Sequence, residues 1–141
     1  MAYAYYLNTQ HRLVIIRPYG EFTDEQLIEV SHAFYSDPDR EPGFDHLWDT
    51  RMIETLVMGV EVIDKYTTFQ EEHEQQAGDG RVAVVATRET TETLATMLFT
   101  FGDEKTEQSQ CIFNDMGAAA EWLDVPSPVV LGVHDDYRSG P

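Results

Sequence analysis

The sequence predicts a single α/β domain built on a mostly parallel sheet. Segments rich in β-favouring residues alternate with amphipathic helical segments, an order typical of parallel strands joined by helices. Residues 82–86 form a continuous apolar run, as expected for a strand covered on both faces. The aromatic segment 3–8 and the apolar run 13–16 flank a short polar loop, which predicts an antiparallel hairpin at the start of the sheet.

Five strands and four helices are predicted, and turn residues separate them. Gly20 ends the second strand, Thr23 or Asp24 caps the first helix, and Pro38 stops it. The strands cover residues 3–8, 12–19, 44–49, 81–87 and 108–113, with a mixed segment after the third strand. The helices cover residues 24–36, 59–76, 90–101 and 116–123. We expect one domain over residues 1–125, followed by a C-terminal tail over residues 126–141.

The net charge of −17 argues against two classes of partner. The chain has 26 acidic residues and only 9 lysines and arginines. Nucleic-acid binding depends on basic side chains that displace counterions from phosphates, so we expect no nucleic-acid partner. Anionic membranes are disfavoured for the same reason. The acids are spread along the chain, which predicts a solvated acidic surface, and adaptation to high salt is an alternative explanation.

Cysteine content and hydropathy indicate the compartment. Cys111 is the one cysteine of the chain, so no internal disulfide can form, in agreement with a reducing environment. No apolar run approaches the roughly 20 residues that a membrane-spanning helix needs. We therefore expect a cytoplasmic protein without membrane insertion.

Four segments, taken in order, resemble a known family. They are residues 12–16 ahead of Gly20, residues 42–51, residues 81–86, and residues 112–115 followed by 120–123. Together they resemble the STAS domain, the fold of the anti-sigma-factor antagonists, to which the CRAL-TRIO lipid-binding domains are structurally related. The resemblance covers roughly residues 3–125 and is greatest to small stand-alone bacterial STAS-like proteins of unassigned function. It implies a non-enzymatic regulatory or interaction module.

One departure from the family concerns its phosphorylation switch. Phosphorylated STAS regulators carry an Asp-Ser-Ser/Thr-Gly type motif where the second helix begins. Here that place reads Thr55-Leu56-Val57-Met58-Gly59, without a hydroxyl beside the glycine. Thr55 lies four positions too early to substitute for the acceptor. The resemblance therefore does not bring a phosphorylation switch to this chain, and the apolar stretch suggests packing or contact with a ligand or partner.

Two strand ends carry the residues best suited to binding an anion. Asp49 and Arg51 follow the third strand, and Thr87 and Arg88 follow the fourth. If these strands are neighbours, the two guanidinium groups line one concavity near the start of the third helix, where free N–H groups also suit a carboxylate or phosphate. The alternative is structural, with Arg51 paired to Asp49 and Arg88 paired to the acidic residues that follow it.

The third helix is apolar over a wide arc. One stripe at helical spacing is expected to face the core, and a second lies beside it. The stripes are Leu94, Met97, Leu98 and Phe101, and Ala95 and Phe99. Either the helix is deeply buried, or it lines an apolar ligand pocket, or it meets another chain. We predict a homodimer in which the second copy covers Phe99 and the tail residues Val129, Val130 and Leu131.

The sequence lacks the parts that the common enzyme classes need. No nucleophile-elbow, Walker or zinc-protease motif occurs, and the five histidines show no paired metal-ligand spacing. We therefore expect no catalytic residues, no metal and no cofactor. The leading hypothesis is a non-enzymatic regulatory or protein-interaction module. The alternative is a small-molecule binder, either of an apolar or lipid-like ligand or of an anion at the carboxyl edge of the sheet.

Overall fold

The computed structural model describes residues 3–101, 110–127 and 138–139. A six-stranded sheet has the order β7-β6-β4-β2-β1-β8, and a separate two-stranded sheet pairs β3 with β5. The strands are β1 (Tyr3–Asn8), β2 (Leu13–Pro18), β3 (Gly20–Thr23), β4 (Asp45–Asp49), β5 (Ile53–Val57), β6 (Val82–Val85), β7 (Gln110–Phe113) and β8 (Arg138–Ser139). The helices are α1 (Asp24–Tyr35), α2 (Val62–Glu72), α3 (Glu74–Ala77), α4 (Glu89–Phe101) and α5 (Met116–Trp122).

The predicted mostly parallel sheet with an N-terminal antiparallel hairpin is confirmed. β1 and β2 pair antiparallel, while β2, β4, β6 and β7 pair parallel in that order. The predicted five strands correspond to β1, β2, β4, β6 and β7, whose segments contain the β-branched and aromatic residues that favour strands. Two residues of the predicted tail, Arg138 and Ser139, add β8 antiparallel to β1.

The second sheet was not predicted. The second predicted strand ends before Gly20, as expected, but Gly20 takes a positive φ of 67°, turns the chain, and starts β3 directly. Its N–H donates to the carbonyl of Met52 over 3.1 Å, which brings the segment predicted as mixed alongside as β5. The expected four helices are also wrong, because the second predicted helix is interrupted at His73 into α2 and α3.

Helix α1 begins where its capping residues predict. The Thr23 hydroxyl accepts a hydrogen bond from the Gln26 N–H over 3.2 Å, and the Gln26 side chain accepts from the Thr23 N–H over 2.9 Å. This reciprocal capping box satisfies two N–H groups at the start of the helix. Asp24 adds a carboxylate in the first turn, which is favourable at the positive end of the helix dipole.

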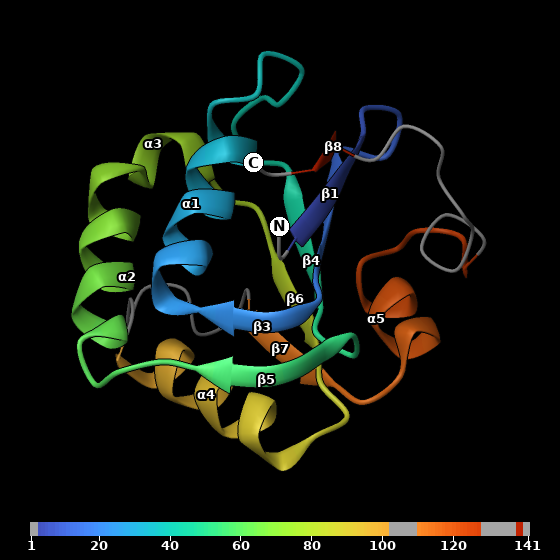
Figure 1. Cartoon of the computed structure of the whole chain (residues 1–141). Coiled ribbons are helices and arrows are strands. Elements are labelled where there is room, and N and C mark those ends of the chain that lie inside the picture. The colour runs from blue at the N-terminus through green and yellow to red at the C-terminus, as the bar shows by residue number, and fades with distance from the viewer. Residues whose placement is uncertain (1–2, 102–109, 128–137, 140–141) are drawn as a thin grey trace.

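Helices cover both faces of the six-stranded sheet and create two cores (Figure 1). We call the side covered by α1, α2 and α4 the α1 face, and the opposite side the α5 face. Alternate residues of each strand point to opposite faces, so β4 sends Trp48 to the α1 face and Leu47 to the α5 face. No helix in the described part of the chain is long and apolar enough to cross a membrane.

Candidate functional site

The carboxyl ends of β4 and β6 lie side by side, as the predicted anion site requires. Asp49 of β4 is opposite Val85 of β6. Asp49 is 1% exposed, and Arg51 binds both of its carboxylate oxygens, with Nε 2.8 Å from Oδ1 and Nη2 2.9 Å from Oδ2. Arg17 Nε donates to Oδ2 over 3.1 Å. Asp49 is therefore held between two guanidinium groups.

These contacts decide the charge state of Asp49. Burial on its own would raise the pKa of the Asp49 carboxyl. The hydrogen bonds from the Arg51 side chain and backbone, and the charges of Arg51 and Arg17, outweigh burial and lower that pKa overall. Asp49 is thus an ionised carboxylate that neutralises the nearby arginines.

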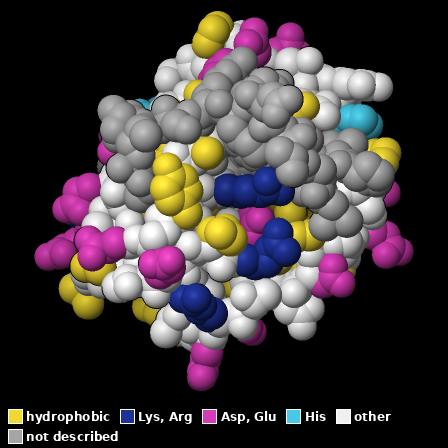
Figure 2. All heavy atoms as spheres, turned by 45° about the vertical axis from the view of Figure 1, so that its right-hand side comes forward, with side chains coloured by type: hydrophobic (Ala, Val, Ile, Leu, Met, Phe, Trp, Pro, Cys, Tyr) yellow, Lys and Arg dark blue, Asp and Glu magenta, His cyan; other side chains and the backbone are white. Residues whose placement is uncertain are grey.

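Arg88 is occupied by the backbone of β5. Its Nη1 donates to the carbonyls of Ile53 over 2.6 Å and Glu54 over 3.1 Å. Among the described residues these carbonyls, not the acids that follow Arg88, are its partners. Thr87 is exposed beside it. Figure 2 shows basic side chains gathered on one face of the molecule, next to an acidic side chain and apolar ones.

Most of the arginine donors at this edge thus have partners within the chain. Arg51 takes the structural pairing considered for it, while Arg88 binds carbonyls in place of carboxylates. Anion binding by Asp49, Arg51, Thr87 and Arg88 stays a prediction.

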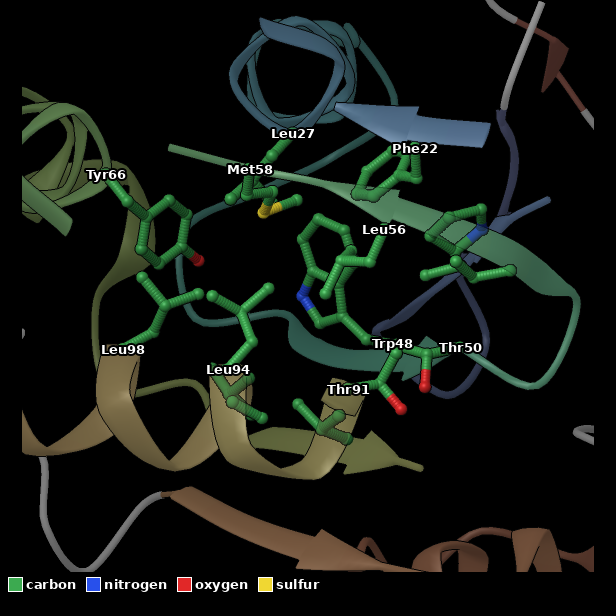
Figure 3. A pocket seen from close by; sticks show the side chains of 15 residues that line it. Phe22, Leu27, Trp48, Thr50, Leu56, Met58, Tyr66, Thr91, Leu94 and Leu98 are labelled. Atoms are coloured by element: carbon green, nitrogen blue, oxygen red, sulfur yellow. The ribbon is translucent and has the colours of Figure 1, made fainter. Parts of the chain in front are cut away.

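An apolar cavity lies under the α1 face, beside Trp48 and Thr50 at the end of β4 and beside Val82 and Val84 of β6. Its volume is about 60 Å³. Side chains from both sheets and from α1, α2 and α4 enclose it (Figure 3). The lining residues are Pro18, Phe22, Leu27, Trp48, Thr50, Ile53, Leu56, Met58, Tyr66, Val82, Val84, Thr91, Leu94, Ala95 and Leu98.

Four of these residues carry polar side-chain groups, and two of the four are already engaged. Thr50 Oγ1 donates to the Val85 carbonyl over 2.7 Å, and Thr91 Oγ1 donates to the Arg88 carbonyl over 2.9 Å. The Trp48 indole N–H and the Tyr66 hydroxyl have no hydrogen-bond partner among the described residues. Burial, followed by proximity to Tyr35, raises the pKa of Tyr66 far above its ordinary value, so its hydroxyl keeps its proton.

A shallow apolar groove lies on the surface next to the cavity. Its volume is about 280 Å³, and it shares Leu56, Met58 and Leu94 with the cavity. Its outer wall includes Val60, which is 89% exposed, and Met97, which is 39% exposed. Met97 was expected in the core stripe of α4; instead Ala95 takes the buried position, because the helix is rotated to direct Leu94, Ala95 and Leu98 inward. We call this surface the Val60 groove.

A buried polar pair lies further along the α1 face. His46 is 5% exposed and Arg40 is 8% exposed, and Arg40 Nη2 lies 3.1 Å from His46 Nε2. The Cζ atom of Arg40 also lies 4.3 Å from the centre of the Tyr35 ring, and its Nη1 donates to the Gln76 carbonyl over 2.9 Å. Burial, and secondarily the Arg40 charge, lowers the pKa of His46 to about 3. His46 is therefore neutral and accepts a hydrogen bond from Arg40.

The side chains predicted to form a dimer interface lie outside the part of the chain that the structure describes. Val129, Val130 and Leu131 lie outside the described residues, as does the side chain of Phe99. In the described part of the chain, no group of three or more His, Cys, Asp or Glu side chains is arranged to hold a metal ion.

The sequence offered an apolar pocket along the third helix as one of three alternatives and identified only part of the wall of this cavity. Leu94 and Leu98 were recognised as core residues, and the apolar stretch Leu56–Met58 was noted for contact with a ligand or partner. The roles of Trp48 and Tyr66 depend on long-range packing between β4 and α2. The signal available in the sequence is the residue type. Trp48 in a predicted strand and Tyr66 in a predicted helix each carry one N–H or O–H group, and such a group normally finds a partner when it is buried.

Comparison with known proteins identifies the fold. No protein-family model and no curated protein matches the chain. An uncharacterised protein of the DUF3478 family from Shewanella loihica PV-4, with a SpoIIAA-like fold, matches with a TM-score of 0.56 and 16% identity over 86% of this chain and 94% of that one. The anti-sigma factor antagonist SpoIIAA in its unphosphorylated form matches with a TM-score of 0.51 and 17% identity, over 85% of this chain and 94% of that one. The chain therefore has the SpoIIAA-like, STAS-type fold that its sequence predicts.

Proposed function

We propose that the chain is a non-enzymatic regulatory module of the STAS type that binds a protein partner at the Val60 groove. The observation that carries this proposal is the exposure of Val60. It is the most exposed large hydrophobic residue among those described, at 89%, and it lies in the loop directly before α2. Exposed apolar side chains grouped beside a groove are typical of a protein-interaction surface.

The local sequence supports a constitutive contact without a phosphorylation switch. The segment that leads into α2 reads Leu56-Val57-Met58-Gly59-Val60-Glu61, so no hydroxyl is available there. Thr55, the nearest hydroxyl before it, lies inside β5. A phosphate at this helix start would add negative charge, whereas Val57 and Val60 offer apolar contact area.

Charge indicates what kind of partner fits. Three exposed acids, Glu54, Glu61 and Glu92, lie close in sequence to the groove residues. The net charge of −17 disfavours a second copy of the same acidic surface and favours a partner with lysine or arginine around an apolar anchor. Self-association through Phe99 and residues 129–131 is the alternative, and native mass spectrometry of the purified chain distinguishes the two.

The test starts from position 60. A photo-crosslinking benzoylphenylalanine in place of Val60 should capture a protein in cells, and the same residue in place of Met52 should not. Met52 is a matched control because it is 61% exposed but does not line the groove. The captured protein is then purified. Val60→Asp should weaken its affinity at least about tenfold, as for an interface hot spot, and Met52→Asp should leave it unchanged. Equal effects of the two substitutions would contradict the proposal.

The cavity favours a second function, the binding of a small apolar molecule. Its walls are almost wholly apolar and include a few polar groups, as is typical of small-molecule sites. This second function does not depend on the identity of the protein partner.

A further inference from the structure

The cavity under the α1 face has walls that select against charge. None of the residues that line it carries a charged side chain. An ionised ligand group placed there would be buried without a counter-charge, at a large cost in free energy. The walls are almost entirely aliphatic and aromatic, so a ligand must present a neutral, mainly apolar body.

Two hydrogen-bonding groups break this apolar lining. Trp48 is 6% exposed, and its indole nitrogen lies on the side of the ring that faces the cavity (Figure 3). The Tyr66 hydroxyl points into the same space from α2. Neither group has a hydrogen-bond partner among the described residues. An indole N–H can only donate, and a protonated phenol donates readily, so both groups are suited to the same acceptor.

We infer that the cavity binds a compact neutral molecule whose acceptor oxygen takes hydrogen bonds from Trp48 and Tyr66. The class is that of small ketones, aldehydes and ethers. A donor-only ligand would leave the Trp48 N–H unpaired, and a pure hydrocarbon would leave both groups unpaired, with a cost for each group kept from water.

The size of the cavity limits how much of the ligand is enclosed. A volume of about 60 Å³ corresponds to roughly two water molecules and is smaller than the about 150 Å³ cavity known to admit benzene. The half-buried side chains Leu56 and Met58 belong to its wall and to the Val60 groove. Met is unbranched and adapts to irregular shapes, so Met58 suits a wall that adjusts to a ligand of a few carbon atoms.

A matched pair of probes tests the inference. Cyclopentanone carries an acceptor oxygen, and methylenecyclopentane has the same shape with CH₂ in its place. Each is titrated into ¹⁵N-labelled protein while the two tryptophan indole N–H signals are followed by NMR. Trp122 packs on Phe113 away from the cavity, so Trp122→Phe removes its signal and identifies that of Trp48. Cyclopentanone should shift the Trp48 indole signal and bind about 3- to 10-fold more tightly than the hydrocarbon.

Variants assign the contacts to individual residues. Tyr66→Phe keeps the aromatic wall and should remove about 3- to 10-fold from the affinity for the ketone, leaving that for the hydrocarbon unchanged. Tyr19→Phe is the control, because Tyr19 does not line the cavity. Equal affinities for the two probes, or an effect of Tyr66→Phe on both, would mean that no oxygen contact exists and would overturn the inference. Absence of binding up to about 10 mM of either probe would overturn it as well.

Discussion

The two faces of the sheet are built from the same strands but are packed very differently. On the α5 face, Leu13, Ile15 and Leu47 are fully buried against a short helix whose Ala119 and Ala120 are also at 0% exposure. Small side chains on α5 allow a close approach, and the buried residues of this face are all non-aromatic, with Tyr6, Phe113 and Trp122 packed against them. The α1 face holds larger and irregular groups, including Trp48, Tyr66, Phe34 and His46, together with the cavity.

This difference indicates that the two faces of one small domain serve different purposes, stability on one face and binding on the other. Aliphatic residues of similar size interdigitate without gaps, and they carry no polar group that needs a partner. Trp and Tyr side chains carry an N–H or O–H group that normally needs a partner when buried, and Trp48 and Tyr66 both line the cavity. We therefore expect a truncation on the α5 face to lower stability more than a truncation on the α1 face. We expect the α1 face to carry the binding functions.

The largest expected effect is a truncation on the α5 face. Leu47→Ala should lower the free energy of unfolding by about 2–5 kcal/mol, because Leu47 is fully buried and its neighbours cannot collapse into the space. Leu94→Ala, on the half-buried wall of the cavity, should cost about 1–2 kcal/mol. Urea unfolding of both variants measures the difference. Equal losses would show that the two faces are packed alike.

The second prediction concerns acid and the α1 face. The pKa of His46 is about 3 in the folded chain, against about 6.5 when unfolded. Between these values the unfolded state binds more protons, so stability falls as the pH is lowered. From about pH 7 to about pH 4, His46 should cost about 2–4 kcal/mol.

The variant His46→Gln isolates this contribution. Glutamine can still accept a hydrogen bond from Arg40 but does not titrate, so its stability should depend less on pH. His11→Gln, in the turn after β1, is the matched control for replacing an imidazole outside the α1 face core. Protonation of surface acids at low pH relieves their repulsion, which acts in the opposite direction and raises stability. This effect is common to the wild type and both variants. Identical pH profiles for wild type and His46→Gln would contradict the assignment.

What the sequence could predict divides instead between local and long-range features. The hairpin, the β4 and β6 strands and the start of α1 are specified by local patterns, namely apolar runs and a capping box. The β3–β5 sheet could not be predicted, because its pairing depends on a positive φ at Gly20 and on contacts across about 30 residues. The cavity depends on how α2, α4 and β5 meet, which no local pattern encodes.

The third prediction tests the polar rim of the α5 face. Asp49 lies on the same side of β4 as Leu47 and joins Arg17 to Arg51. Asp49→Asn should lower stability by about 1–3 kcal/mol, because two partly buried guanidinium groups lose their counter-charge. Glu41→Gln removes the exposed pair with Arg12 and should cost less than about 1 kcal/mol. Thermal unfolding of both variants checks this, and a larger loss for Glu41→Gln would contradict the view of Asp49 as the buried anchor of this edge.

The smallest expected effect is that of salt, and it separates the outer surfaces of the two faces. The net charge of −17 implies that folding brings carboxylates together, and Glu71, Glu72 and Glu74 are exposed near the end of α2 and in α3. Salt shortens the range of this repulsion from about 30 Å at 0.01 M to about 3 Å at 1 M. The melting temperature should therefore rise over that range. A gain of roughly 1 kcal/mol in the free energy of unfolding corresponds to a rise of a few degrees. Glu72→Lys should reduce the rise more than Glu121→Lys in α5, where fewer acids lie nearby in sequence. A flat or falling melting temperature would mean that the acids are too far apart, or too well paired, to repel one another.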